Sequence, residues 1–226
     1  MTATIPATVL FDWDGTLFDS GAASLRAFRK SMADFGVAFT DEKYRAIYTP
    51  RWYRMYEALG LAGELWKQAD QRWQHHYGGE APGLMPGAGR VLDALRARGI
   101  VTGMVTNGTR PRIEKELACL GLESSFGAVV CHEDVTHSKP HPEGVLKALA
   151  TMGCVPGTCW YVGDTPVDME QGRNAGVFTV GIVTDYVDAA RMHESRPDLI
   201  LHSIAELPDA LVRGQVGYPM DVRRDR

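Results

Sequence analysis

The sequence predicts an α/β fold: a Rossmann-like parallel sheet with helices on both faces, plus an inserted α-helical cap domain. Two observations lead to this prediction. Short strand-prone runs alternate with amphipathic helical stretches along most of the chain, which is typical of a parallel sheet covered on both sides. The segment from about Ser20 to Pro82 breaks this rhythm, because it contains helical patterns and no convincing strand.

The elements follow in order along the chain. Strands are expected at short strand-prone runs, several of which end at glycine or polar residues: Thr8–Phe11, Ile100–Val105, Ala128–Cys131, Cys159–Val162 and Phe178–Ile182. Helices are expected between them, at Gly87–Arg98, up to Leu120, at Pro142–Met152 and up to about Ala175. The inserted segment predicts further helices at Ser20–Phe35, Asp41–Tyr48, Arg51–Leu59 and Gly63–Tyr77. We therefore expect a core of residues 1–18 and 83–213, a cap of residues 19–82 and a flexible C-terminal tail of residues 214–226.

The inserted segment is rich in large aromatic residues. We expect these side chains to pack helices together rather than to form a base-stacking platform. They are Trp52, Tyr53, Tyr56, Trp66, Trp73 and Tyr77.

Composition excludes some classes of partner. The formal net charge of −4 is unlike the basic balance of a nucleic-acid-binding protein, although local cations can still bind a small anion. The four cysteines form no Cys-x-x-Cys pair, and we expect free thiols in a reducing compartment. The N-terminal residues do not have the pattern of a secretory signal, and no apolar run is long enough to span a membrane. The expected protein is cytoplasmic, binds neither nucleic acid nor membrane, and is a monomer or homodimer.

Polar residues gather where the predicted strands end. Because ligands bind at the carboxyl ends of parallel strands, we expect the following residues to converge. They are Asp12, Asp14, Thr106, Asn107, Asp164 and Asp168, joined by Lys139 from the Ser138–Pro142 segment.

Several carboxylates at one point repel each other unless a cation neutralises them. Oxygen ligands favour Mg²⁺, which also binds substrate phosphates. One carboxylate could then attack phosphorus, while a second could protonate the leaving oxygen and later deprotonate water. Thr106 and Lys139 would hold the phosphoryl oxygens. This set of residues predicts a phosphatase for a small phosphate ester.

Four motifs in this order, FDWDGTLFDS, VTNGT, SKPHPE and VGDTPVDMEQGRNAG, resemble the haloacid dehalogenase superfamily, in its phosphoglycolate-phosphatase-like branch. The resemblance extends from about Thr8 to about Leu211 and implies specific roles. Asp12 would be nucleophile and metal ligand. Asp14 would be general acid/base and a metal ligand through its backbone oxygen. Asp164 would bind Mg²⁺. Phosphate would be bound by Thr106, Asn107 and Lys139. Asp168 would support the metal or Lys139 from outside the set of direct ligands.

The family contains other reactions. Asp14 argues against the metal-free dehalogenases and against the phosphonate-cleaving members, which lack an aspartate at this position. A sugar-phosphate mutase of the β-phosphoglucomutase type keeps all these aspartates and stays open as an alternative. A phospho-accepting switch module is the third alternative, although Asp14 would shorten the life of the phosphorylated state.

Substrate specificity is expected from the cap. Arg51 lies about where such proteins carry a specificity loop, and its guanidinium could pair with a carboxylate or a second phosphate. Phosphoglycolate is the leading named candidate because it carries a carboxylate. Trp13 is expected to narrow the pocket.

Overall fold

The computed structural model describes residues 5–49, 52–80, 82–185 and 189–213. Its central sheet has six parallel strands in the order β3-β2-β1-β4-β5-β6. The strands are β1 Thr8–Phe11, β2 Val101–Val105, β3 Val129–Val130, β4 Cys159–Gly163, β5 Phe178–Ile182 and β6 Leu199–Leu201. The predicted fold class is confirmed. The first five strands lie where they are predicted, and β6 at the sheet edge was not predicted.

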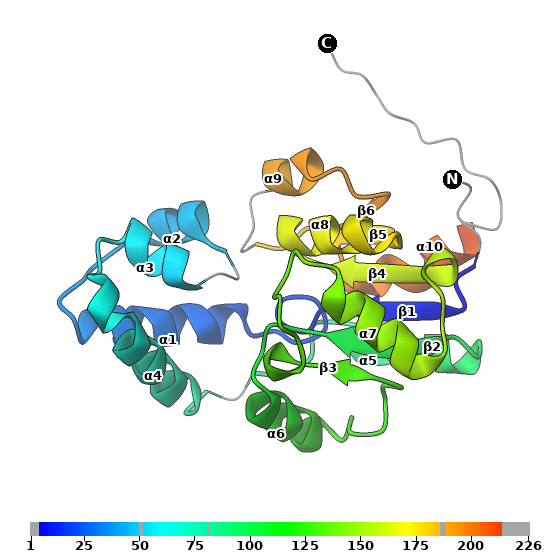
Figure 1. The fold of residues 1–226 in the computed structure, drawn as a ribbon, viewed down its shortest axis with the longest axis horizontal. Coiled ribbons are helices and arrows are strands. Elements are labelled where there is room, and N and C mark those ends of the chain that lie inside the picture. Colours follow the sequence, from blue (N-terminus) through cyan, green and yellow to red (C-terminus); the bar gives the residue numbers. More distant parts are fainter. Residues whose placement is uncertain (1–4, 50–51, 81, 186–188, 214–226) are drawn as a thin grey trace, which may run out of the picture.

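The helices divide into two groups (Figure 1). Those that accompany the sheet are α5 Ala88–Ala97, α6 Arg110–Leu120, α7 Glu143–Met152, α8 Pro166–Ala175, α9 Ala189–Glu194 and α10 Leu207–Arg213. Those of the insertion are α1 Gly21–Ala33, α2 Asp41–Ile47, α3 Trp52–Ala58 and α4 Trp66–Tyr77, which form a separate group beside the sheet. None of the helices within the described ranges is both long enough and apolar enough to cross a membrane.

Successive side chains of β1 point to opposite faces of the sheet, and both faces are buried. Val9 and Phe11 pack into one apolar cluster with residues of α5, α6 and α10. Leu10 points the other way, into a second cluster with residues of α7 and the end of α8. This period of two is the normal consequence of strand geometry, and burial on both faces explains why β1 has no exposed position. The residue after β1 therefore follows a strand that is buried along its whole length.

The inserted helices have a core of their own. Phe28 of α1 is fully buried and stacks on Tyr56 of α3 with ring centroids 5.7 Å apart. Tyr44 of α2 packs against the same phenylalanine at 5.5 Å. Trp73 of α4 stacks on Tyr77 at 4.7 Å. The aromatic residues of this segment do pack helices together, as expected from the sequence.

The chain leaves and re-enters the core through two adjacent segments. The backbone N–H of Asp19 donates to Gly83 O at 2.8 Å, and the N–H of Met85 donates to Leu17 O at 2.8 Å. Phe18 and Leu84 form an antiparallel bridge between them. The exit and the return are thus joined to each other beside the predicted domain boundaries at 18/19 and 82/83.

Candidate active site

The sheet order places β1 between β2 and β4, which is where the direction of winding reverses. Ligands of open α/β sheets bind at this point, beyond the carboxyl ends of the strands. Asp12 follows β1 and its backbone N–H donates to Val162 O of β4 at 2.9 Å. Thr106 follows β2, and Asp164 follows β4. The three strands therefore bring these side chains to one edge of the sheet.

Three carboxylates meet at this edge. Oxygen atoms of Asp12, Asp164 and Asp168 all lie within 4.8 Å of one another, and the three residues are 6%, 2% and 1% exposed. The ammonium of Lys139, itself 4% exposed, donates to Asp12 Oδ1 at 2.5 Å and to Asp168 Oδ1 at 2.7 Å. A single lysine thus faces three buried acids.

Burial and, to a smaller extent, the neighbouring carboxylates shift the pKa values of the acids. Burial raises the pKa of Asp12 to about 7, and Lys139 only partly opposes this shift. Burial and the nearby Asp12 and Asp168 also raise the pKa of Asp164 well above its ordinary value. The attraction of the carboxylates outweighs burial at Lys139, so the pKa of its ammonium is also raised and the side chain stays charged.

Asp168 is held at both carboxylate oxygens. Its Oδ1 accepts from Lys139 and from Tyr161 Oη, the latter at 3.1 Å. Its Oδ2 accepts from the backbone N–H and the hydroxyl of Thr165 at 3.0 and 2.5 Å, which forms the capping box of α8. Because both of its oxygens are held, Asp168 can orient Lys139. This arrangement supports the predicted role of Asp168 as a residue that supports Lys139 or the metal from outside the set of direct ligands.

The donor set fits Mg²⁺. Asp12 and Asp164 offer hard carboxylate oxygens in a buried site with more negative than positive charge, as that ion requires. The hydroxyl of Thr16 donates to Asp164 Oδ1 at 3.3 Å and helps to orient this carboxylate. Gly15 has φ +80° and lies so close that a Cβ there would be 2.3 Å from Asp164 Oδ2. The glycine of the motif therefore makes room for the acid.

Asp14 has a partner that was not predicted from the sequence, Arg112 of α6. Arg112 Nη1 donates to Asp14 Oδ1 at 2.9 Å, and Arg112 Nη2 donates to Oδ2 at 2.5 Å. Burial alone would raise the pKa of Asp14, but the guanidinium overrides it and holds the pKa below its ordinary value. Arg112 also donates to Glu116 Oε1 at 3.1 Å and lies over the Tyr77 ring. α6 begins shortly after β2 ends, so its first turn lies at the same edge of the sheet, but no local pattern in the sequence pairs Arg112 with Asp14.

Thr106 and Asn107 lie together after β2, as expected. Thr106 is 4% exposed, and its Oγ1 accepts from the backbone N–H of Gly108 at 3.0 Å. Both Thr106 and Asn107 line the same cavity as Asp12. Arg51, the predicted substrate ligand of the cap, lies outside the described residues.

A cavity of about 880 Å³ joins this edge of the sheet to the inserted helices. The core contributes all the predicted acids together with Thr106, Asn107 and Lys139. The insertion contributes polar residues such as Arg54, Glu57 and Asp70, together with six aromatic side chains, namely Tyr48, Trp52, Tyr53, Trp66, Trp73 and Tyr77. The aromatic residues thus serve as both packing core and cavity wall.

Trp13 does not narrow this cavity, and that expectation is wrong. The side chain is fully buried, stacks on Phe18 with centroids 5.0 Å apart, and donates from Nε1 to Glu116 Oε2 at 2.8 Å. Because side chains of this motif alternate in direction, Trp13 points into the core while its two aspartate neighbours line the cavity.

Comparison with known proteins agrees with this geometry. Residues 9–182 match the family model described as haloacid dehalogenase-like hydrolase. Pyrophosphatase PpaX of Oceanobacillus iheyensis is 27% identical over 206 residues, which cover 88% of this chain and 94% of that protein. Phosphoglycolate phosphatase of Escherichia coli is 34% identical over 128 residues, which cover 57% of this chain and 51% of that protein.

A solved structure extends the similarity to the fold. A haloacid dehalogenase-like hydrolase of Bacteroides fragilis superposes with a TM-score of 0.82 at 26% identity, over 89% of this chain and 99% of that one. With the family model matched over most of the chain, the predicted family is confirmed. The chain belongs to the haloacid dehalogenase-like hydrolases.

Proposed function

We propose that this protein is a Mg²⁺-dependent phosphatase that hydrolyses a small phosphate monoester through an aspartyl-phosphate on Asp12. The observation that carries the proposal is the position of Asp12. It lies at the end of the central strand, 2.5 Å from Lys139 and beside Asp164, on the wall of a cavity large enough for a small metabolite.

In the first step a carboxylate oxygen of Asp12 attacks phosphorus, and the bond between phosphorus and the ester oxygen breaks. Lys139 holds the other side of the carboxylate at Oδ1 and stays charged, so it also attracts the phosphoryl oxygens. The Thr106 hydroxyl and the Asn107 amide lie on the same cavity wall and would donate to them. When bound by Asp12, Asp164 and the backbone oxygen of Asp14, Mg²⁺ would neutralise charge on the acids and on the phosphoryl group.

Asp14 would move the protons. It gives a proton to the leaving alcohol oxygen in the first step. In the second step it takes a proton from a water molecule, whose oxygen attacks phosphorus and breaks the bond to Asp12. Inorganic phosphate leaves, and Asp12 is regenerated. Because Arg112 holds Asp14 ionised, the negative charge of an entering phosphate must raise the pKa of Asp14 before it can donate a proton.

Two observations bear on the substrate. The relatives reported above are named for pyrophosphate and phosphoglycolate, and both molecules carry a second anionic group beside the transferred phosphoryl group. In this chain Arg112 and Lys115 line the cavity from α6 and could attract such a group. Phosphoglycolate therefore remains the leading candidate ester, and pyrophosphate is the second compound to test.

The test is phosphate release from a panel of phosphate esters and pyrophosphate, with and without Mg²⁺. Wild type is compared with Asp12→Asn and with Asp19→Asn, a matched change at an exposed aspartate of the same segment. We expect metal-dependent release that is lost in Asp12→Asn and kept in Asp19→Asn. Absence of release from every compound, with Mg²⁺ binding intact, would sink the phosphatase proposal.

The alternatives leave different products. A sugar-phosphate mutase would convert a hexose 1-phosphate into its isomer with little free phosphate. A switch module would accumulate a long-lived phosphoprotein detectable by mass spectrometry. Cytoplasmic location and a monomeric or homodimeric state stay predictions from the sequence.

A further inference from the structure

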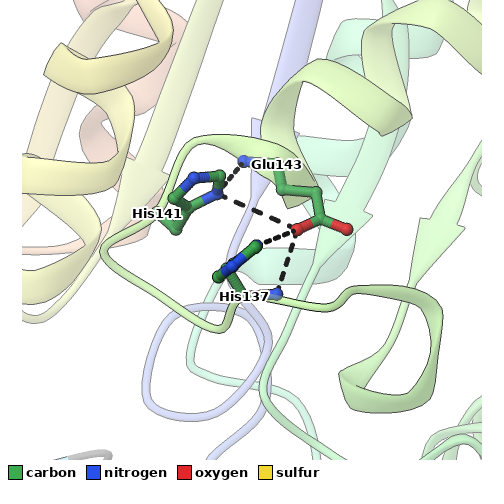
Figure 2. A group of neighbouring side chains, drawn as sticks. All are labelled: His137, His141 and Glu143. Atoms are coloured by element: carbon green, nitrogen blue, oxygen red, sulfur yellow. Dashed lines mark hydrogen bonds and ion pairs between the residues drawn. The ribbon is translucent and has the colours of Figure 1, made fainter.

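The segment that carries Lys139 also holds two histidines and a glutamate that the proposed reaction does not use. Figure 2 shows the rings of His137 and His141 gathered at the carboxylate of Glu143, on one side of the loop before α7. His137 Nδ1 lies 3.1 Å from Glu143 Oε2, and His141 Nδ1 lies 3.9 Å from the same oxygen. The two ring centroids are 4.5 Å apart.

We propose that His137, His141 and Glu143 form a binding site for a divalent transition-metal ion of the Zn²⁺ class. The site stands independently of the proposed phosphatase activity. Two imidazole nitrogens and one carboxylate oxygen are the donors that Zn²⁺ and its neighbours prefer, and water would complete the coordination.

The observed spacing suits such an ion. With metal–ligand distances of about 2.0–2.2 Å, two ligands of a tetrahedral site lie about 3.3 Å apart. One of the two nitrogen–oxygen distances is already close to this value, and all three donor atoms lie within 4.8 Å of one another. The imidazoles of His137 and His141 are 61% and 50% exposed, so small ring rotations can close the remaining gap.

The carboxylate is already anchored for this role. The backbone N–H groups of Thr136 and His137 donate to its two oxygens at 2.8 and 3.0 Å. These hydrogen bonds, the one from Thr136 foremost, hold the pKa of Glu143 below its ordinary value, so the group is ionised at neutral pH. The ligand that is hardest to desolvate is thereby fixed in position before an ion arrives.

The imidazoles present the right atoms. The backbone N–H of Glu143 donates to His141 Nδ1 at 3.3 Å, so this nitrogen carries a lone pair that can bind a metal ion once that hydrogen bond is broken. His137 Nδ1 faces the carboxylate, and a metal ion would take the place of the proton between them. Each donor therefore needs to lose only a proton or one weak hydrogen bond.

Chemistry separates this site from the aspartates. The buried acids near Asp12 offer only oxygen and suit Mg²⁺, whereas imidazole favours transition metals. In the sequence, Lys139 lies midway between the two histidines, and its ammonium donates hydrogen bonds to Asp12 and Asp168. An ion bound by His137 and His141 would therefore cross-link the two ends of the turn that delivers Lys139.

The test is isothermal titration of the metal-free, full-length protein with ZnCl₂ in millimolar MgCl₂, which occupies the oxygen sites. The variant is the double change His137→Asn and His141→Asn. The matched control is His193→Asn with His202→Asn, two exposed histidines outside the cluster. We expect saturable Zn²⁺ binding that weakens about tenfold or more in the variant and is unchanged in the control.

Two further readouts sharpen the result. The visible spectrum of the Co²⁺-substituted protein should show the intense bands of a four- or five-coordinate ion in wild type and lose them in the variant. Far-UV circular dichroism checks that both double variants are folded. Equal Zn²⁺ affinity in wild type and in the folded variant would overturn the proposal, and so would a Co²⁺ spectrum that the variant leaves unchanged.

Discussion

The guanidinium of Arg112 donates hydrogen bonds to both carboxylate oxygens of Asp14, at 2.9 and 2.5 Å, although the two residues are 98 positions apart in the sequence. Such a parallel pair of charge-assisted bonds is specific to arginine. Arg112 is in turn held by Glu116 of the same helix, α6. This helix therefore positions the carboxylate of Asp14, which transfers the protons in the proposed reaction. The ionisation state of Asp14 is therefore set by a residue outside the sequence motifs of the site.

Replacing Arg112 by Met should raise the pKa of Asp14. The guanidinium lowers that pKa, whereas burial raises it, so without the guanidinium the effect of burial is no longer offset. Asp14 would then keep its proton to higher pH, and the alkaline limb of kcat/KM should move upward. Carbon-detected NMR of the carboxylate measures the shift directly. Arg112→Lys, which keeps the charge, is the control, and an unchanged pKa in Arg112→Met would contradict the prediction.

Gly15→Ala should impair the site although every carboxylate residue is kept. The new Cβ would lie 2.3 Å from Asp164 Oδ2 and must displace it. We expect phosphate release to fall by about 100-fold or more, because small displacements of reacting groups carry penalties of that size. Mg²⁺ affinity, measured by calorimetry, should fall with it.

Gly36→Ala separates this clash from backbone strain. Gly36 also has a positive φ, +71°, but no atom lies within 4 Å of a Cβ built there. This variant should lose about 1 kcal/mol of unfolding free energy and keep full activity. Equal activity in both alanine variants would show that the space beside Asp164 is unimportant.

Lys139→Met should destabilise the metal-free protein. The change leaves Asp12, Asp164 and Asp168 buried without their shared cation, and removing one partner of a buried ion pair costs about 3–5 kcal/mol. Urea unfolding measures the loss, and added Mg²⁺ should restore part of it. Lys67→Met on the exposed face of α4 serves as the control and should be neutral. The idea fails if the two lysine variants unfold at the same urea concentration.

The stabilisation by Mg²⁺ should grow with pH. Burial raises the pKa of Asp12 from 3.8 to about 7, so between these values the folded protein holds a proton that the unfolded chain has lost. Stability of the metal-free protein must therefore fall as pH rises through this window. Thermal unfolding with and without Mg²⁺ should show a larger metal-induced shift at about pH 8 than at about pH 5. Asp12→Asn should flatten the difference, and a shift that is independent of pH would argue against the raised pKa.

Local patterns were sufficient to predict most of the core. Each of the first five strands lies in a short strand-prone run, and Asp12, Thr106 and Asp164 were located as residues that follow such runs. β6, the three-residue edge strand Leu199–Leu201, was not predicted. Its pairing with β5 depends on the rest of the sheet.

Side-chain direction was harder to predict than position. Trp13 and Asp14 are neighbours, yet one packs into the core and the other lines the cavity. The pairing of Arg112 with Asp14 depends on how α6 is set against the sheet, which no local pattern encodes. The sequence can place a residue at an edge, but the partner that determines its charge state comes from a distant segment.

The joined segments around Leu17 and Met85 have a mechanical consequence. Two separate tethers would let the inserted helices slide and twist independently, whereas a hydrogen-bonded ribbon resists shear and bends most readily across its thin direction. The inserted helices and their aromatic cavity wall are thereby held to the core by one paired connection rather than by two independent ones.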